Sequence, residues 1–479
     1  MNEAHALRAF PAPAAVSADE VRAASEALGS RLVVLDDDPT GTQSVADLPV
    51  LTRWEIDDFA AVFATEAPAV YVLTNARSLG DDDARLRNLE VAQNALAAAA
   101  TAGVEVEFVS RGDSTLRGHF PLETDTLAAA VAAAGGAPID GVVIVPAFPD
   151  AGRITVGGVH YMRDGDDLQP IGETEFARDA TFGYRSSNLA AWVEEKSGGR
   201  YPAHAVITLD LGTIRAGATA VADAIQDAVD LTPIVCDVVT EDDLRLISVG
   251  LIEARRRGKT LLSRVGPPFV RARIGSERRE PLTAAEIYPD GGTDRGGLIV
   301  VGSHVAVTTR QLSRLRETNP DLTDIEIDVA RVLDADGAPA YLRAIADRVV
   351  DELEGSDVVI STTRTVTTAA TADDSLRIAR TVSAAVVDVV REVVARTRPR
   401  FVVAKGGITS SDVAAHGLAM RQATVRGPML PGIISLWEPA DGPATGIPYV
   451  VFAGNVGDDD ALAQVVSTLT RTPAAVTGR

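Results

Sequence analysis

The chain has 479 residues, more than a single hydrophobic core accommodates, so at least two domains are expected. Its formal net charge of −22 opposes a general nucleic-acid or anionic-membrane surface, because such a surface would have to bind phosphate groups that this charge repels. A single cysteine, Cys236, excludes an intramolecular disulfide, and no cluster of cysteine and histidine has the spacing of zinc ligands.

Short runs rich in Val and Ile alternate with Ala-rich stretches of helical period, while aromatic residues make up only 4% of the chain. This pattern predicts an α/β fold of parallel strands joined by crossover helices. The longest helix expected in the first half runs from Asp82 to Ala102 and opens on acidic residues, which suit a helix N-terminus. The strands expected there begin at Arg31, Ala69, Val104, Gly141, Ala205 and Pro233.

A basic segment punctuated by Gly and Pro, residues 271–296, interrupts this rhythm and is predicted to connect two domains. The expected domains cover residues 1–270 and 297–479. Each is predicted to be a largely parallel sheet with flanking helices, and the active site is expected in the cleft between the two domains. The strands expected in the second half begin at Gly297, Asp324, Asp357, Phe401, Ile433 and Tyr449.

The first twenty residues lack the basic start and the apolar core of a signal peptide. No apolar run in the sequence reaches the ~18 residues that a membrane-spanning helix needs. A cytoplasmic location without a membrane partner is therefore expected, and a homodimer is compatible with the sequence.

Polar clusters in the first half follow directly after the apolar strands. Open parallel sheets bind their ligands at the carboxyl ends of the strands, so these clusters are expected to meet at one sheet edge. Their mixture of carboxylate, amide and guanidinium groups suits a small ligand with several hydroxyls and a carboxylate. The residues expected to surround this ligand are Asp37, Asp38, Asn75, Arg77, Asp113, Ser114, Arg117 and Arg153.

Three Gly-rich turns occupy the same position in the second half: VGSHVAVTTR, AKGGITSSDVA and FAGNVGDDDAL. Each follows a predicted strand and leads into a predicted helix. Glycine lets backbone N–H groups approach a ligand, and a helix N-terminus adds partial positive charge, so such turns can bind phosphate without a basic patch. Lys405 is the expected point charge among them.

The strand-linked sequence LVVLDDDPTGT permits another interpretation, a haloacid-dehalogenase-type phosphatase. In such an enzyme Asp36 would be the nucleophile, with Asp38 and Thr40 beside it. Thr74 and the acidic residues after Gly457 would complete the site, although those acids lie at the end of the second predicted domain. A two-domain solute sensor without catalytic activity is a third class of function.

Two other signals carry less weight. The tripeptide GKT at 258–260 is not a P-loop, because the earlier glycine of that motif is Glu253 and the segment follows a helix. His119, His160 and His304 follow the polar clusters and could donate to substrate or phosphate, but a lone loop histidine is more often structural.

Six motifs resemble, in order, the landmarks of the four-carbon acid sugar kinase family: DDPTG at Asp37, DSTLRG at Asp113, PAFPDAGR at Pro146, and then VGSH, KGGIT and AGNVG. The resemblance spans nearly the whole chain, from Arg31 to Leu469. It implies that the N-terminal domain binds a sugar acid and the C-terminal domain binds ATP. The implied reaction transfers phosphate, aided by Mg²⁺, to the terminal hydroxyl of a tetronate or 3-oxo-tetronate.

The resemblance also implies roles for single residues. It places Asp37, Asp113 and Arg117 on the substrate side. There we expect Asp37 or Asp113 to accept the hydroxyl proton, and Arg117 together with Lys405 to neutralise charge on the transferred group. Asp38 would belong to the same side, whereas the ligands of the metal stay unassigned. The residues implied to hold ATP are Ser303, Gly406, Gly407, Ile408, Thr409 and Gly454.

The sequence departs from the family pattern at three places. Asp36 stands where relatives usually have Ala, and His119 stands where they often have Asn. Ile408 stands where the common GGETSGA motif has Glu, so this position offers no carboxylate to a nucleotide or a metal. The segment that begins at Glu173 is expected to form a substrate lid or wall.

Overall fold

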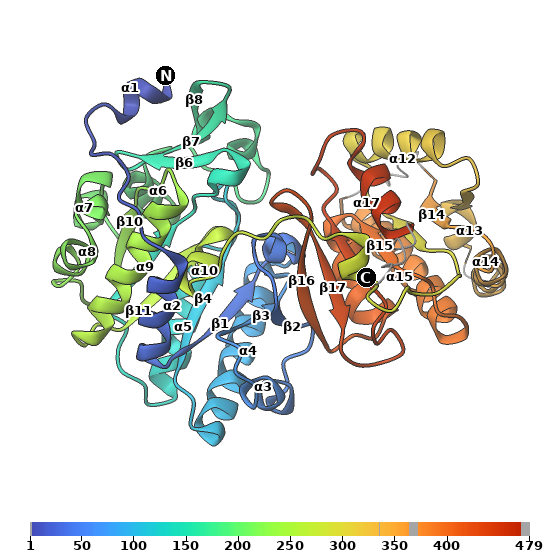
Figure 1. The fold of residues 1–479 in the computed structure, drawn as a ribbon, viewed down its shortest axis with the longest axis horizontal. Coiled ribbons are helices and arrows are strands. Elements are labelled where there is room, and N and C mark those ends of the chain that lie inside the picture. Colours follow the sequence, from blue (N-terminus) through green and yellow to red (C-terminus); the bar gives the residue numbers. More distant parts are fainter. Residues whose placement is uncertain (1, 335, 364–371, 471–479) are drawn as a thin grey trace, which may run out of the picture. The chain divides into compact units, whose positions relative to one another are not determined.

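The computed structural model describes residues 2–334, 336–363 and 372–470. The chain forms two compact units, shown in Figure 1. Unit 1 consists of Met1–Pro49 and Trp54–Arg278, and unit 2 consists of Val50–Arg53 and Arg279–Arg479. Unit 1 therefore extends eight residues beyond the predicted boundary at residue 270, and unit 2 includes four residues from the first half of the chain.

Unit 1 is built on a parallel sheet, as predicted, with the strand order β3-β1-β4-β11-β5-β10-β9. The last residues of neighbouring strands are in register, since Asp36 pairs with both Leu73 and Arg111, and Arg111 pairs with Val265. This register brings the loops that follow these strands to one sheet edge. The strands are β1 (Arg31–Asp36), β3 (Ala69–Leu73), β4 (Val106–Arg111), β5 (Gly141–Val145), β9 (Ile207–Leu209), β10 (Thr232–Cys236) and β11 (Leu261–Val265).

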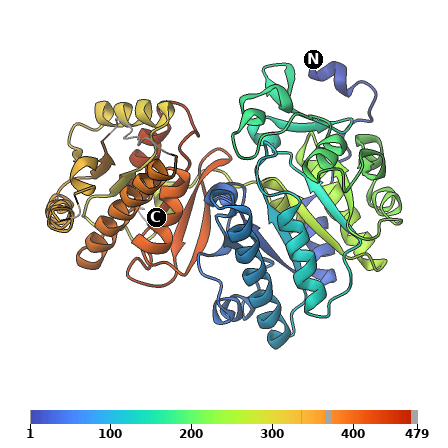
Figure 2. The same ribbon diagram turned by 180° about the vertical axis from the view of Figure 1, so that it is seen from behind.

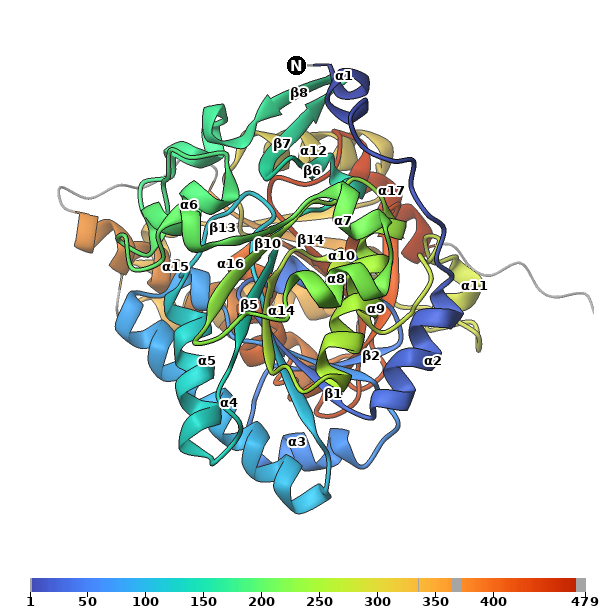
Figure 3. The same cartoon turned by 90° about the vertical axis from the view of Figure 1, so that its left-hand side faces the viewer.

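Helices cover both faces of this sheet. Helix α4 packs against both α3 and α5 on one face, which is turned towards the viewer in Figure 2. Helices α2, α9 and α10 pack together on the other face, as the view in Figure 3 shows. The helices of unit 1 are α1 (Glu3–Leu7), α2 (Ala18–Leu28), α3 (Ile56–Phe63), α4 (Asp81–Ala102), α5 (Leu122–Ala133), α6 (Leu189–Lys196), α7 (Leu211–Arg215), α8 (Ala218–Ala224), α9 (Glu241–Arg256) and α10 (Pro268–Arg273).

A small antiparallel sheet, which the sequence analysis did not predict, follows β5. Its strands are β6 (Arg153–Val156), β7 (Val159–Asp164) and β8 (Asp167–Pro170). The apolar side chains of this sheet form a cluster with Leu211 and Val239, against which Leu7 and Phe10 from the N-terminal segment pack. Arg163 on β7 also donates two hydrogen bonds to Glu3, at 2.7 and 2.8 Å.

Within unit 2 the strand order is β13-β14-β12-β15-β18-β17-β16. The first five strands are parallel, whereas β17 is antiparallel to both of its neighbours. Val301, Lys405 and Phe452 are in register at the ends of adjacent strands. The strands are β12 (Leu298–Val301), β13 (Thr323–Ile327), β14 (Val358–Thr362), β15 (Val402–Lys405), β16 (Gln422–Leu430), β17 (Ile433–Pro439) and β18 (Tyr449–Phe452).

In this sheet β13 and β14 lie on one side of the central strand β12, and β15 and β18 lie on its other side. Ligands of such sheets bind at this change of direction, here between the carboxyl ends of β12 and β15. Helices α12 and α17 contact each other, as do α14 and α15. The helices are α11 (Ala284–Ile287), α12 (Ala306–Thr318), α13 (Val329–Val332), α14 (Ala338–Glu352), α15 (Ala372–Arg396), α16 (Gly407–Asp412) and α17 (Ala461–Thr470).

The short strand β2 (Leu48–Leu51) lies where the chain passes between the units. Within unit 2, the backbone N–H of Thr52 donates to the carbonyl of Arg421 at 3.0 Å, and the Thr52 hydroxyl donates to the carbonyl of Met420. Residues 50–53 are therefore part of the hydrogen-bonded structure of unit 2. Over the described parts of the chain, no helix combines the length and the apolarity needed to cross a bilayer.

Candidate functional site

The carboxylate of Asp37, directly after β1, is held by a guanidinium group from the loop after β3. Arg77 donates from Nη2 to Oδ1 of Asp37 at 2.7 Å and from Nε to Oδ2 at 3.1 Å. Asp37 is buried, and the side chain of Arg77 is only 18% exposed. Arg77 also lies 3.8 Å from Asp38, which accepts a hydrogen bond from the backbone N–H of Thr40 at 2.9 Å. Burial acts to raise the pKa of Asp38, but Arg77 and Arg111 outweigh it and hold that pKa below its usual value.

Asp36, the last residue of β1, forms a buried ion pair with Arg111 at the end of β4. Burial raises the pKa of Asp36 to about 7, against the opposing effect of Arg111. The Thr74 hydroxyl donates to the backbone carbonyl of Asp36 at 2.8 Å and is itself buried. Asp36 is thus enclosed and paired, unlike the exposed nucleophile that the phosphatase interpretation requires. The acids after Gly457 belong to unit 2, so that interpretation is not supported.

The loop after β4 carries a second acidic and basic pair. Arg117 donates from Nε to Oδ2 of Asp113 at 2.6 Å, and the Thr115 hydroxyl donates to the same oxygen. Burial opposes ionisation of Asp113, but Arg77 and Arg117 hold its pKa far below the usual range. The side chain of Asp113 is 12% exposed, compared with 1% for Asp37.

The segment after Glu173 packs against this loop. Arg117 lies 3.6 Å from the carboxylate of Asp179, and its guanidinium carbon lies 5.2 Å from the ring centre of Phe176. His119 meets Phe182 edge to face at 4.9 Å. The predicted lid or wall is therefore in contact with the DSTLRG motif.

The other predicted site residues of unit 1 lie at different distances from the charged cluster around Asp37 and Asp113. Arg153 begins β6, donates to the carbonyl of Ala151 at 2.7 Å, and has a buried Nε without a hydrogen-bond partner. Burial lowers the pKa of Arg153, and Asp113 and Arg117 both act on its charge, so the three lie close together. Ser114 is buried beside Asp113. Asn75 has a left-handed backbone with a φ of 52°, and its side chain makes no recorded contact with the charged cluster.

Three charged residues beneath the site were missed from the sequence. Arg264, on β11, donates to the Ser110 hydroxyl at 2.7 Å, pairs with Glu123, and lies 4.0 Å from Asp37. Arg264, Glu123 and Arg111 are thus the three residues. A signal was present, because a charged residue inside an otherwise apolar strand such as LLSRV has to find a buried partner.

Glycine is required where the chain passes these guanidinium groups. A Cβ atom on Gly118 would lie 2.6 Å from Nη2 of Arg264 and 3.1 Å from Oδ2 of Asp37. A Cβ atom on Gly112 would likewise overlap the Arg264 guanidinium. These two glycines let the DSTLRG loop lie directly on the buried charges.

In unit 2, the turns after β12 and β15 contact each other. The backbone N–H of Ser303 donates to the carbonyl of Lys405 at 3.2 Å. Gly406 has a φ of 131°, and a Cβ there would lie 3.0 Å from the Thr409 hydroxyl and 3.3 Å from Cβ of Ser303. A Cβ on Gly302 would collide with the Thr409 side chain. Because the two turns approach each other so closely, only glycine fits at positions 302 and 406.

The turn after β18 joins the same edge. The Thr308 hydroxyl donates to the carbonyl of Gly454 at 2.7 Å and lies 3.2 Å from the Ser303 hydroxyl. A Cβ on Gly454 would lie 2.5 Å from the Ser303 hydroxyl. The three predicted turns are thus in contact with one another in unit 2.

Lys405 does not extend into solvent. Its ammonium group donates to the carbonyl of Ala453 at 2.6 Å and lies 3.7 Å from the ring centre of Phe452. Lys405 is fully buried, and this burial lowers its pKa to about 7. Gly407 and Ile408 begin α16, and the Ile408 side chain is 62% exposed. The N–H groups in the first turn of a helix have no acceptor within it, so they are available to a ligand.

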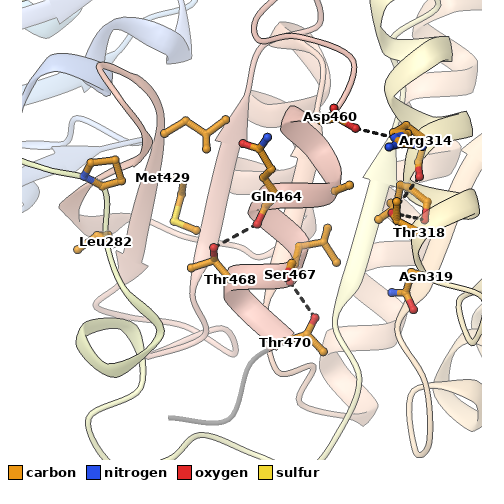
Figure 4. A pocket seen from close by; sticks show the side chains of 15 residues that line it. Leu282, Arg314, Thr318, Asn319, Met429, Asp460, Gln464, Ser467, Thr468 and Thr470 are labelled. Atoms are coloured by element: carbon orange, nitrogen blue, oxygen red, sulfur yellow. Dashed lines mark hydrogen bonds and ion pairs between the residues drawn. The ribbon is translucent and has the colours of Figure 1, made fainter. Parts of the chain in front are cut away.

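A separate pocket of about 940 Å³ lies in unit 2 against α12 and α17 (Figure 4). Arg314 reaches Asp460 at 2.6 Å across one wall, and the Thr468 hydroxyl donates to the carbonyl of Gln464 at 3.1 Å. None of the predicted site residues lines this pocket. No group of three or more His, Cys, Asp or Glu side chains placed to hold a metal ion occurs within residues 2–334, 336–363 and 372–470.

Family models match most of the chain. Residues 32–273 match a sugar-binding N-terminal domain, and residues 298–462 match a nucleotide-binding C-terminal domain. The first match contains the charged cluster of unit 1, and the second contains the three Gly-rich turns of unit 2.

Two curated relatives have similar sequences. A D-erythronate kinase from Heliobacterium modesticaldum is 27% identical over 69% of this chain and 70% of its own length. A D-threonate kinase from Cupriavidus necator is 27% identical over 53% of this chain and 54% of its own length.

Two solved structures share the fold. One, described as a putative tRNA synthase from Salmonella typhimurium, has a TM-score of 0.65 at 19% identity and covers 91% of this chain and 98% of its own. The other, a protein from Haemophilus influenzae, has a TM-score of 0.59 at 18% identity and covers 91% of this chain and 100% of its own. At this identity the likeness establishes the architecture alone.

Proposed function

Because the chain belongs to the four-carbon acid sugar kinase family, we propose that it transfers the γ-phosphate of ATP to the terminal hydroxyl of a four-carbon sugar acid, a tetronate or a 3-oxo-tetronate. The observation that carries the proposal is the pairing of a sugar-binding match over the charged cluster with a nucleotide-binding match over the Gly-rich turns. The relatives named for D-erythronate and D-threonate support the size and the acidity of the substrate.

Asp113 is the better candidate for the residue that accepts the hydroxyl proton. Both carboxylate oxygens of Asp37 receive hydrogen bonds from Arg77, and Asp37 is almost fully buried. On Asp113, hydrogen bonds from Arg117 and Thr115 converge on Oδ2, while the structure records none to Oδ1. The depressed pKa of Asp113 keeps it ionised, so it can orient a substrate hydroxyl for in-line attack. We assign Asp37 to fixing the position of Arg77.

Arginine side chains would recognise the substrate carboxylate. Arg153 has one hydrogen bond to a backbone carbonyl and a buried Nε without a partner, so it has donors to offer a carboxylate in the planar, bidentate geometry of a guanidinium group. Arg117, which pairs with Asp113 and Asp179, would meet the charge that develops on the transferred group. Asp38 and Asn75 would contact the substrate hydroxyls.

The turns of unit 2 would bind the nucleotide. Their residues fit a phosphate, because glycine occupies the positions of closest approach and Ser303 and Thr409 add hydroxyl donors. We assign Lys405 to holding the turn at Ala453, since its ammonium already donates to that carbonyl. Mg²⁺, when bound with ATP, would neutralise phosphate charge, with Asp458 after β18 as the candidate protein ligand in unit 2.

The test is a phosphoryl-transfer assay with the purified full-length chain. The protein is incubated with ATP and Mg²⁺ and with each of D-erythronate, L-erythronate, D-threonate, L-threonate and the 3-oxo-tetronates. Mass spectrometry should detect ADP together with an acid whose mass has risen by one phosphate. EDTA should stop the reaction. Release of phosphate from phosphorylated acids without ATP, or no turnover of any acid, would refute the proposal.

A further inference from the structure

Two side chains from outside the DSTLRG motif hold the backbone of its loop. His160, on β7, lies with Nε2 at 2.8 Å from the carbonyl of Ser114. The Tyr184 hydroxyl donates to the next carbonyl in the chain, that of Thr115, at 2.6 Å. We call His160 and Tyr184 the carbonyl clamp.

The orientation of the His160 ring follows from its partners. A carbonyl can only accept, so Nε2 carries the hydrogen that is donated to Ser114. Burial lowers the pKa of His160 to about 4, so the ring is neutral and Nδ1 is an acceptor. The Thr155 hydroxyl, 2.9 Å from Nδ1, is therefore the donor to it.

Thr155 is in turn fixed to the segment that follows β10 in unit 1. Its backbone N–H donates to the carbonyl of Val238 at 2.9 Å, and the N–H of Val238 donates back to Thr155 at 3.0 Å. Thr155 and His160 are both fully buried. Hydrogen bonds thus connect the segment after β10, through Thr155 and His160, to Ser114.

The loop that the clamp holds has an unfavourable backbone conformation. Leu116 has a φ of 68°, a left-handed conformation that costs a residue with a Cβ about 1 kcal/mol or more. The left-handed turn lies between Asp113 and Arg117, whose side chains meet at 2.6 Å. Hydrogen bonds to the two preceding carbonyls hold this turn in place while the loop is packed against Arg264 through Gly112 and Gly118.

We propose that His160 and Tyr184 are positioning residues for phosphoryl transfer, which act through the carbonyls of Ser114 and Thr115 on the placement of Asp113 and Arg117. The inference rests on the proposed kinase activity. Neither side chain is assigned a contact with substrate, so His160 is a structural support of the reacting groups and not a donor to the sugar acid. A displacement of about 1 Å in reacting groups can lower a rate by about 10²-fold, which sets the size of effect to look for.

The experiment uses the full-length chain with Mg-ATP and the best acid of the panel, D-erythronate being tried first. Tyr184→Phe removes the donor to Thr115 and nothing else. His160→Leu removes the donor to Ser114, whereas the side-chain amide of His160→Gln can still donate to it. Tyr288→Phe is the matched control, because Tyr288 is equally buried and its hydroxyl donates to the carbonyl of Arg400 in unit 2, at 3.3 Å.

Tyr184→Phe and His160→Leu should each lower kcat by about 10-fold or more, with an unchanged KM for ATP. His160→Gln should stay within about 3-fold of wild type, as should Tyr288→Phe. A second readout is trypsin cleavage after Arg117, followed by mass spectrometry, which should accelerate in Tyr184→Phe and His160→Leu alone.

The proposal would be overturned if Tyr184→Phe kept both the wild-type kcat and the wild-type rate of cleavage. It would also be overturned if all four variants lost activity in proportion to the fall in their melting temperatures. If the wild-type protein phosphorylates no acid, the proposed kinase activity fails. Cleavage after Arg117 then decides separately whether the clamp holds the loop: faster cleavage in Tyr184→Phe supports that part, and unchanged cleavage overturns it.

Discussion

Arg77 occupies both carboxylate oxygens of Asp37, with Nη2 2.7 Å from Oδ1 and Nε 3.1 Å from Oδ2. The two residues follow neighbouring strands, β1 and β3, and both are largely buried. Asp37 therefore lies at the centre of the site without a free oxygen, whereas Asp113 keeps Oδ1 free of recorded partners at the edge of the same cluster. The two aspartates should respond differently to the same substitution.

Asp113→Asn should lower kcat by about 10²-fold or more, because the group that accepts the hydroxyl proton is lost. Asp37→Asn should act first on stability, because Arg77 and Arg111 lose a buried counter-charge, and a loss of about 3 kcal/mol in the free energy of unfolding is expected. Steady-state kinetics and denaturant unfolding of both variants measure these effects. Asp57→Asn, at an exposed position on α3, is the control.

The opposite ranking would reassign the roles. If Asp37→Asn keeps the wild-type unfolding free energy but loses turnover, while Asp113→Asn remains active, Asp37 is the acceptor of the proton.

Asp36 should be dispensable for chemistry but not for folding. Asp36→Asn keeps an oxygen that can accept from Arg111, so turnover should stay within about 5-fold of wild type. Asp36→Ala removes the partner of a buried guanidinium group and should cost about 3–5 kcal/mol of stability. Kinetics and denaturant unfolding separate these effects. A phospho-aspartyl adduct trapped on Asp36 would instead revive the phosphatase interpretation.

The α/β class and most strand positions were predictable because the strands of a buried parallel sheet are short apolar runs, as in β1 and β5. The polar loops after them were also recognisable, which is why Asp37, Arg77 and Asp113 were predicted to lie at one sheet edge, where the structure brings them together. The small sheet β6–β8 was missed, since its strands mix polar and apolar residues and its core is a local cluster with Leu7 and Phe10.

Non-local contacts explain two further features that the sequence did not predict. Residues 50–53 join unit 2 through hydrogen bonds from Thr52 to Met420 and Arg421, a relationship that no local pattern encodes. The orientation of the Lys405 side chain could not be predicted from the sequence either, because a lysine after a strand can point to a ligand or back to a carbonyl. Its contact with Ala453 is decided by packing against Phe452.

Gly454→Ala tests the nucleotide site. The added methyl group would lie 2.5 Å from the Ser303 hydroxyl and would displace it, so the affinity for Mg-ADP should fall by about 10-fold or more. Isothermal titration calorimetry on the full-length chain measures the affinity. Gly355→Ala is the matched control in unit 2, because a Cβ there has no neighbour within 4 Å.

Ser303 should account for this effect. Because the displaced group is its hydroxyl, Ser303→Ala should weaken ADP binding by itself, and the double variant should lose less than the sum of the two single losses. Additive losses would show that the two residues act at separate places, and an unchanged affinity in Gly454→Ala would remove the turn after β18 from the nucleotide site.

The stability of the protein should depend on pH through His160. Its pKa is about 4 in the folded protein and near 6.5 in an unfolded chain, so between these values the unfolded state binds the extra proton. The contribution of the neutral ring is therefore fully present above pH 6.5 and is lost as the pH falls towards 4. Arg153 and Asp113, the charged groups that act on the ring, stay ionised over this range.

His160→Gln does not titrate, so the free energy of unfolding of wild type minus that of the variant isolates this contribution. The difference should shrink by up to about 3 kcal/mol between pH 6.5 and pH 4. Urea unfolding at half-unit pH intervals measures it, and His204→Gln, which makes the same change at an exposed position, is the control. A difference that stays constant would mean that folding leaves the pKa of His160 unchanged, and a difference that grows as the pH falls would mean that the folded protein binds the proton more tightly than the unfolded chain. In the second case Nδ1 would carry a hydrogen, and the Thr155 hydroxyl would have to accept it.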